Sequence, residues 1–90
     1  MKKQGEKKAK RTLIFDQEGI KLLAVQIKKV RLSKNYTQRQ LAFEAGLSRS
    51  QIDRIENGHI NPTVSTIFAI ARTLDIPITE LFRFELTPNK

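Results

Sequence analysis

The stretch from residue 20 to residue 34 carries apolar residues at helical spacing. Leu23, Ile27 and Val30 follow one another at intervals of four and three residues, which places their side chains on one face of a helix. Lysines occupy several of the remaining positions and would face water or phosphate. The pattern therefore predicts a helix over residues 20–34 that buries one apolar stripe.

Two capping boxes follow this first predicted helix. In Thr37-x-x-Gln40 and in Ser48-x-x-Gln51, the hydroxyl of the first residue can accept a hydrogen bond from the backbone N–H of the fourth. The amide side chain of the fourth residue can reach back to the N–H of the first. Gly46 stands between the boxes, and a glycine can take the left-handed conformation that ends a helix.

These signals predict two short helices, over residues 38–45 and over residues 49–57, the second ending at Gly58. The turn that joins them is short and contains a glycine. Two short helices connected in this way are typical of a helix-turn-helix.

Two more helices are predicted toward the C-terminus. Apolar residues form a wide face between residues 64 and 74, after a helix start at Pro62-Thr63. Residues 76–82 indicate a short fifth helix, with Pro77 near its first position, where the missing N–H costs little. The expected fold class is all-α, a bundle of five short helices.

Short β-prone segments flank the predicted bundle at residues 12–15 and 82–86, and apolar and charged residues alternate in the second segment. One hypothesis is that the two segments pair as strands, within one chain or between two chains. The alternative is that Leu13, Phe15 and Phe84 cover the end of the bundle. Both interpretations concern packing rather than chemistry.

Length and composition predict one domain with flanking tails, since 90 residues suit a single core. We expect a basic disordered tail over 1–11, an extended segment over 12–19, a helix-turn-helix domain over 20–82 and a C-terminal tail over 83–90.

Charge is distributed unevenly over these segments. The formal net charge is +8 and the sequence pI is about 10.2, which favours a polyanionic partner. Residues 1–11 hold six basic residues against one acidic, and residues 12–90 hold eleven against eight. Most of the excess thus lies in the tail, which either solvates the protein or forms an arm along the DNA backbone or in the minor groove.

Composition argues against several other classes of protein. The chain has no cysteine and one histidine, His59, so no metal site is expected. No apolar run approaches the ~20 residues of a membrane span, and the apolar stretch after the basic start is too short for a secretory signal. No nucleotide-binding or nucleophile motif is present. We therefore expect a cytoplasmic protein that is not an enzyme and needs no cofactor.

The polar residues of the predicted helix 49–57 fall on one arc when successive residues are placed 100° apart. They are Arg49, Ser50, Asp53, Arg54 and Asn57, and the isoleucines of the helix lie opposite. Arginine can bind guanine O6 and N7 with two hydrogen bonds, serine can pair with several base edges, and asparagine can bind phosphate. The arc therefore suits the major groove of DNA, although any surface helix also has a polar side.

Asp53, in the middle of this arc, argues against DNA because a carboxylate repels phosphate. Two other interpretations stay open. The carboxylate could accept a hydrogen bond from cytosine N4, or it could orient Arg49 and Arg54, which lie one turn and one residue away.

Taken together, the motifs resemble the Cro/repressor-type helix-turn-helix family, also called the XRE family, which includes the lambdoid phage repressors. The resemblance extends over roughly residues 23–82 and departs from the family at Pro77, where a Ser or Thr cap is frequent. The residues that carry it are YTQRQLA at 36–42, AGLS at 45–48, IDRIENG at 52–58 and NPT at 61–63.

The resemblance implies a lambda-repressor-like bundle in which helix 49–57 enters the major groove and helix 38–45 crosses the DNA backbone. Arg49, Ser50 and Arg54 match base-reading positions of the family. Gln38, Ser48 and Asn57 match positions that contact the DNA backbone. Arg31 and Glu56 match a pair that forms a largely buried salt bridge between the first and third helices.

The expected function is sequence-specific binding of double-stranded DNA and regulation of transcription, as a repressor or autoregulator. Because one domain makes few base contacts, we expect a homodimer whose half-sites lie one helical turn apart. Another class stays open: an antitoxin-like or coactivator-like module that binds a protein partner, with DNA binding secondary. RNA binding is disfavoured, since Tyr36 and most phenylalanines are expected to pack rather than to stack on bases.

Overall fold

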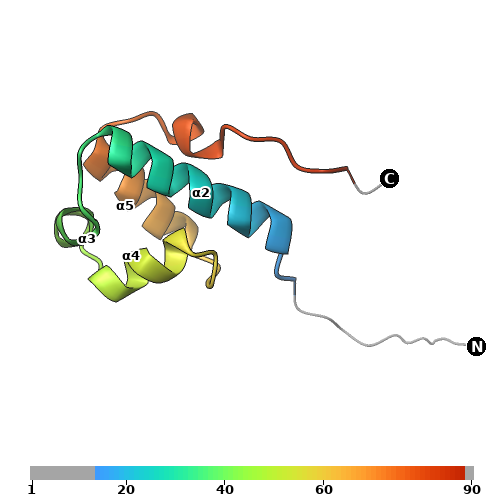
Figure 1. The fold of residues 1–90 in the computed structure, drawn as a ribbon, viewed down its shortest axis with the longest axis horizontal. Coiled ribbons are helices and arrows are strands. Elements are labelled where there is room, and N and C mark those ends of the chain that lie inside the picture. Colours follow the sequence, from blue (N-terminus) through green and yellow to red (C-terminus); the bar gives the residue numbers. More distant parts are fainter. Residues whose placement is uncertain (1–13, 89–90) are drawn as a thin grey trace, which may run out of the picture.

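The computed structural model describes residues 14–88 and is helical, without a strand, over that range (Figure 1). Four α-helices are followed by one short 3-10 helix: α2 (Gln17–Ser33), α3 (Gln38–Ala45), α4 (Arg49–Glu56), α5 (Val64–Leu74) and η1 (Ile78–Phe82). The predicted all-α fold is confirmed, with a 3-10 helix as its fifth member. The predicted basic tail lies outside the described residues. None of the helices described is long and apolar enough to cross a membrane.

Helix α2 begins at Gln17, three residues before its predicted start. Asp16 caps it, because its carboxylate accepts a hydrogen bond from the backbone N–H of Gly19 at 2.9 Å. Residues 17–19 include no large apolar residue, so apolar spacing could not reveal this extension of the helix. The helix ends at Ser33, and Asn35 then takes a positive φ of 62° as the chain turns toward α3.

Both predicted capping boxes are present. Thr37 Oγ1 accepts from the backbone N–H of Gln40 at 3.0 Å, and Gln40 Oε1 accepts from that of Thr37 at 2.9 Å. Ser48 and Gln51 exchange the equivalent hydrogen bonds at 3.0 and 3.1 Å. Gly46 ends α3 in the left-handed conformation, with φ 76°. The helix-turn-helix predicted from these signals is confirmed.

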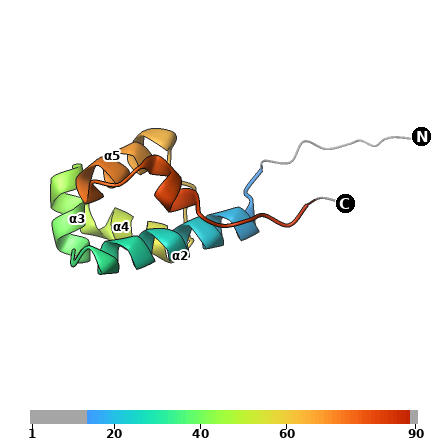
Figure 2. The ribbon, with the colours of Figure 1, turned by 90° about the horizontal axis from the view of Figure 1, so that it is seen from above.

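Buried residues of all four α-helices and of η1 form the core, and α3 crosses one end of the bundle (Figure 2). The predicted stripe of α2 is buried, and the largest fully buried side chains are Ile27, Leu41, Ile52, Ile70, Leu74 and Leu81. A hydrogen bond connects α2 to η1, because Gln26 Nε2 donates to the carbonyl of Glu80 at 2.8 Å. The apolar face predicted for α5 is only partly covered, because Val64 and Phe68 stay exposed.

Residues 83–88 follow η1 as an extended segment that packs against the start of α2. Thr87 binds the carboxylate of Glu18, from its backbone N–H at 3.2 Å and from its hydroxyl at 2.8 Å. Residues 82–86 form no strand within the described residues 14–88, and pairing between two chains stays a hypothesis. The alternation of apolar and charged residues also suits a single extended segment whose apolar side lies on a helix.

Phe84 is half-buried against the core, as the alternative interpretation expects, whereas Phe15 is exposed. Leu13 lies outside the described residues. The C-terminal segment thus covers one end of the bundle by packing.

Candidate nucleic-acid interface

Helix α4 presents the predicted polar arc on its outer side. Arg49, Ser50, Asp53, Arg54 and Asn57 are all exposed, whereas both isoleucines of the helix are buried. The structure thus brings five polar side chains together on one face. Two of them are arginines, whose guanidinium donors match guanine edges and phosphates.

The two ends of α4 are fixed by local hydrogen bonds. Ser48 Oγ serves as the N-cap and accepts from the backbone N–H of Gln51. At the other end, Asn57 Nδ2 donates to the carbonyl of Asp53 at 2.9 Å, and Gly58 turns the chain with φ 70°. The two residues expected near the DNA backbone at either end of this helix, Ser48 and Asn57, therefore have one polar atom each already engaged.

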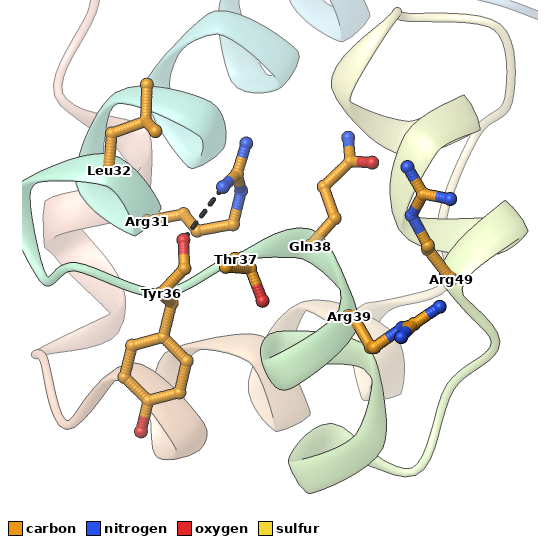
Figure 3. Close-up of a pocket in the computed structure, with 7 residues that line it drawn as sticks. All are labelled: Arg31, Leu32, Tyr36, Thr37, Gln38, Arg39 and Arg49. Carbon is orange, nitrogen blue, oxygen red and sulfur yellow. Dashed lines mark hydrogen bonds between the residues drawn. The ribbon is translucent and has the colours of Figure 1, made fainter.

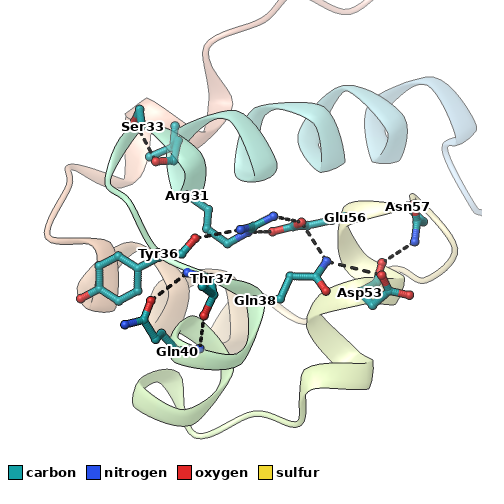
Figure 4. A network of polar contacts seen from close by, with 10 residues as sticks. Arg31, Ser33, Tyr36, Thr37, Gln38, Gln40, Asp53, Glu56 and Asn57 are labelled. Carbon is teal, nitrogen blue, oxygen red and sulfur yellow. Dashed lines mark hydrogen bonds and ion pairs between the residues drawn. The ribbon is translucent and has the colours of Figure 1, made fainter.

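A buried ion pair lies beneath this face and joins α2 to α4 (Figure 4). Arg31 Nε donates to Glu56 Oε2 at 2.6 Å, and Arg31 Nη2 donates to Glu56 Oε1 at 2.9 Å. The two side chains are 7% and 2% exposed. Arg31 Nη1 also donates to the carbonyl of Tyr36 at 2.8 Å, so the same guanidinium holds the turn before α3. These are the two residues that the family resemblance pairs.

Gln38 connects α3 to α4 from the first position of α3. Its Nε2 donates to Glu56 Oε1 at 3.1 Å and lies 3.4 Å from Asp53 Oδ1 (Figure 4). Both amide hydrogens are therefore directed to α4, and the remaining side-chain oxygen can only accept. A phosphate contact at this position consequently needs a backbone N–H of the first turn of α3, or an exchange of one of these hydrogen bonds.

An open hollow borders the first turns of α3 and α4 (Figure 3). Its charged lining includes Arg39 from α3 and Arg49 from α4, and both side chains are exposed. The helix N-terminus and the two guanidinium groups together favour an anion. Sequence reasoning missed Arg39, although a basic residue in the first turn of a helix next to Gln38 was the available signal.

Tyr36 belongs to the scaffold beside this hollow. Its hydroxyl donates to Glu44 Oε1 at 3.0 Å, with the carbonyl of Thr73 3.2 Å away as a second acceptor. The hydrogen bond to Glu44 raises the pKa of Tyr36 above its ordinary value. The residue thus ties the turn before α3 to α3 itself and to α5.

A protein-family model described as helix-turn-helix (HTH_3) matches residues 27–81. The match runs from within α2 into η1, and it includes the six residues of the bundle that were expected to contact DNA.

Two curated proteins show sequence similarity over most of this range. The chain is 42% identical over 60 residues to the HTH-type transcriptional regulator SlrR of Bacillus subtilis, covering 66% of the chain and 40% of that protein. It is 35% identical over 57 residues to antitoxin HipB of Escherichia coli, covering 63% of the chain and 65% of that protein. The chain therefore spans about two fifths of the length of SlrR and just under two thirds of that of HipB.

A solved structure shares the arrangement of the helices. The restriction-modification controller protein C.AhdI from Aeromonas hydrophila superposes with a TM-score of 0.69 at 33% sequence identity. The similarity covers 70% of this chain and 96% of C.AhdI. The helical bundle described above thus accounts for nearly all of that protein.

Proposed function

The chain belongs to the helix-turn-helix family (HTH_3), and on this premise we propose that it binds double-stranded DNA sequence-specifically and regulates transcription. In the proposed complex α4 lies in the major groove and α3 crosses the DNA backbone. One observation carries the proposal: α4 exposes two arginines on a single polar face, above a buried ion pair and between fixed helix ends.

We assign base recognition to Arg49, Ser50 and Arg54, which lie on the outer arc of α4. Each guanidinium can make two hydrogen bonds to guanine, and the serine hydroxyl can donate or accept. The face is small, so three base-reading residues in one protomer specify only a few base pairs.

Contacts to the DNA backbone are assigned to Gln38, Ser48 and Asn57, as the resemblance implies, and to Arg39 from the structure. The first turn of α3 offers backbone N–H groups beside Arg39, and these groups and the guanidinium can bind the same phosphate. Such contacts orient α4 in the groove without reading the sequence.

We further propose that the protein binds DNA as a homodimer, because two-fold symmetry doubles the number of base pairs read. The exposed apolar surface of α5 supports this. Val64 and Phe68 are 65% and 47% exposed, and Phe68 borders a shallow apolar hollow that also includes Ile76 and Ile78. A symmetric dimer places its two α4 helices one turn of DNA apart, about 34 Å.

Selection of binding sites from random DNA by the purified protein tests the proposal. We expect enriched half-sites spaced by one helical turn. Arg49→Ala and Arg54→Ala are each expected to weaken binding to the selected site by about tenfold or more, because each removes a pair of hydrogen bonds to a base.

Lys29→Ala is a matched control, since it removes one positive charge from the side of α2 that faces η1. It is expected to change affinity little. Arginine variants that behave like Lys29→Ala would show that α4 does not read DNA.

The similarity to antitoxin HipB favours one second candidate, a module that binds a protein partner while DNA binding is secondary. Under this alternative, Arg49→Ala and Arg54→Ala leave DNA affinity unchanged, and a partner protein stays bound during purification. The same two variants therefore separate the two functions.

A further inference from the structure

Asp53 places a negative charge in the middle of the outer face of α4. Its side chain is exposed, one turn from Arg49 and next to Arg54. In the proposed complex phosphates line both edges of the groove, so a carboxylate here lowers the affinity for every DNA sequence. A contact that only some sequences provide would offset this general loss.

The carboxylate of Asp53 contributes little to holding the protein together. Among residues 14–88 no cationic side chain lies within 4.0 Å of it. Its one side-chain hydrogen bond in that range comes from Gln38 Nε2 at 3.4 Å, which is long for such a bond. The same nitrogen has a shorter hydrogen bond to Glu56, at 3.1 Å. Asp53 therefore keeps most of its acceptor capacity for a ligand.

Orientation of the neighbouring arginines does not explain this residue. Neither Arg49 nor Arg54 forms an ion pair with Asp53, although both lie on the same face of α4. In Figure 4, Asp53 lies between Gln38 and Asn57 in the hydrogen-bonded series that starts at Arg31, and Asn57 binds its backbone carbonyl rather than its carboxylate. The carboxylate is exposed on the outer face of α4, where a ligand can reach it.

We propose that Asp53 is a specificity-determining residue that accepts a hydrogen bond from the N4 amino group of a cytosine in the major groove. The inference rests on the proposed DNA binding. An ionised carboxylate only accepts hydrogen bonds, and cytosine presents a donor in the groove. Guanine and thymine present acceptors there, and adenine presents a donor beside an acceptor. Asp53 thus selects cytosine by attraction and disfavours guanine and thymine by repulsion.

This cytosine contact also suits the two neighbouring arginines. Arg49 and Arg54 match guanine, and every guanine in a duplex is paired with a cytosine. Acidic and basic residues on one short helix can therefore read the two strands of the same or adjacent G·C pairs. The half-site is expected to contain a cytosine within the base pairs that the arginines contact.

The test compares base preferences at each position of the selected half-site. Dissociation constants are measured for all four bases with the wild type, with Asp53→Asn and with Glu85→Gln. Asp53→Asn keeps the shape of the side chain but turns one acceptor into a donor. Glu85→Gln removes one negative charge from the exposed C-terminal segment and is the matched control. Thermal unfolding of all three proteins establishes that they are equally folded.

At one position the wild type is expected to bind cytosine at least about fivefold more tightly than guanine or thymine. Asp53→Asn loses this preference, and Glu85→Gln keeps it. Replacing that cytosine with 2-pyrimidinone, which lacks the amino group, weakens binding of the wild type more than binding of Asp53→Asn.

The proposal is wrong if Asp53→Asn changes affinity by the same factor for all four bases at every position, as the control does. In that case the carboxylate of Asp53 affects DNA affinity only through its negative charge and reads no base. A wild-type protein that selects no DNA sequence would instead overturn the proposed function, and this inference with it.

Discussion

At the scale of single residues, the buried pair of Arg31 and Glu56 makes the fold sensitive to the loss of either side chain. Two charges that are almost fully removed from water are compensated only by each other and by a few hydrogen bonds. The pair therefore contributes to the arrangement of α2, α3 and α4 more than to net stability, because burying two charges offsets much of their attraction.

Removing one member of this pair is expected to destabilise the protein strongly. Glu56→Ala leaves the Arg31 guanidinium buried without a counter-charge, and we expect a loss of about 3–5 kcal/mol in the free energy of unfolding. Denaturant unfolding followed by circular dichroism measures this loss.

The double variant Arg31→Met, Glu56→Leu removes both charges and is expected to cost less than Glu56→Ala alone. A double variant as unstable as the sum of the two single variants would show that the charges act independently.

At the scale of secondary-structure elements, the caps determine whether α4 is formed along its full length. With eight residues, α4 is too short to be stable in isolation and depends on its N-cap and its packing. Ser48→Ala removes the hydroxyl that binds the N–H of Gln51, and we expect a loss of about 1 kcal/mol in the free energy of unfolding. Thermal unfolding measures the change.

Ser48→Asn is the control for this prediction, because asparagine is also a favourable N-cap residue. It is expected to retain most of the stability. Equal losses for the alanine and asparagine variants would contradict a capping role.

Local signals explain why this part of the fold could be predicted from the sequence. Capping boxes and a glycine turn act over three or four residues, so α3 and α4 are recognisable from Thr37, Gly46 and Ser48 alone. The first turn of α2 was missed because its cap, Asp16, precedes residues with no apolar pattern. The sequence left two interpretations of residues 82–86 open because the alternation of apolar and charged residues does not distinguish a paired strand from a segment lying on a helix.

The candidate site was predictable only in part. Helical periodicity indicates which residues of α4 face outward, and the buried isoleucines agree with it. The hydrogen bonds of Gln38 to α4 join residues 15 and 18 positions apart, and no local pattern indicates such contacts. Arg39 has a local signal, a basic residue in the first turn of α3, but its place beside Arg49 depends on how the two helices pack.

At the scale of the whole molecule, most of the net positive charge precedes the bundle. Residues 2–11 contain six basic residues. If this tail follows the DNA backbone, its deletion weakens binding to all sequences by similar factors. The slope of log affinity against log salt also becomes less negative, by roughly 0.9 for each phosphate that the tail neutralises in the full chain.

Dissociation constants of the full chain and the deletion variant, at several salt concentrations, measure this effect. Unfolding temperatures are expected to agree between the two proteins, since the tail precedes the core. Affinity that is unchanged at every salt concentration would assign the tail to solvation alone.

The buried pair and Gln38 also bear on how the protein docks in the proposed complex with DNA. They connect α2, α3 and α4 by hydrogen bonds within the chain, so the angle between the two helices of the motif is established on folding. The conformational entropy of ordering those helices is then lost before association rather than during it. We therefore expect docking of a nearly rigid body, with an association rate that responds to ionic strength and a dissociation rate that responds to the base sequence.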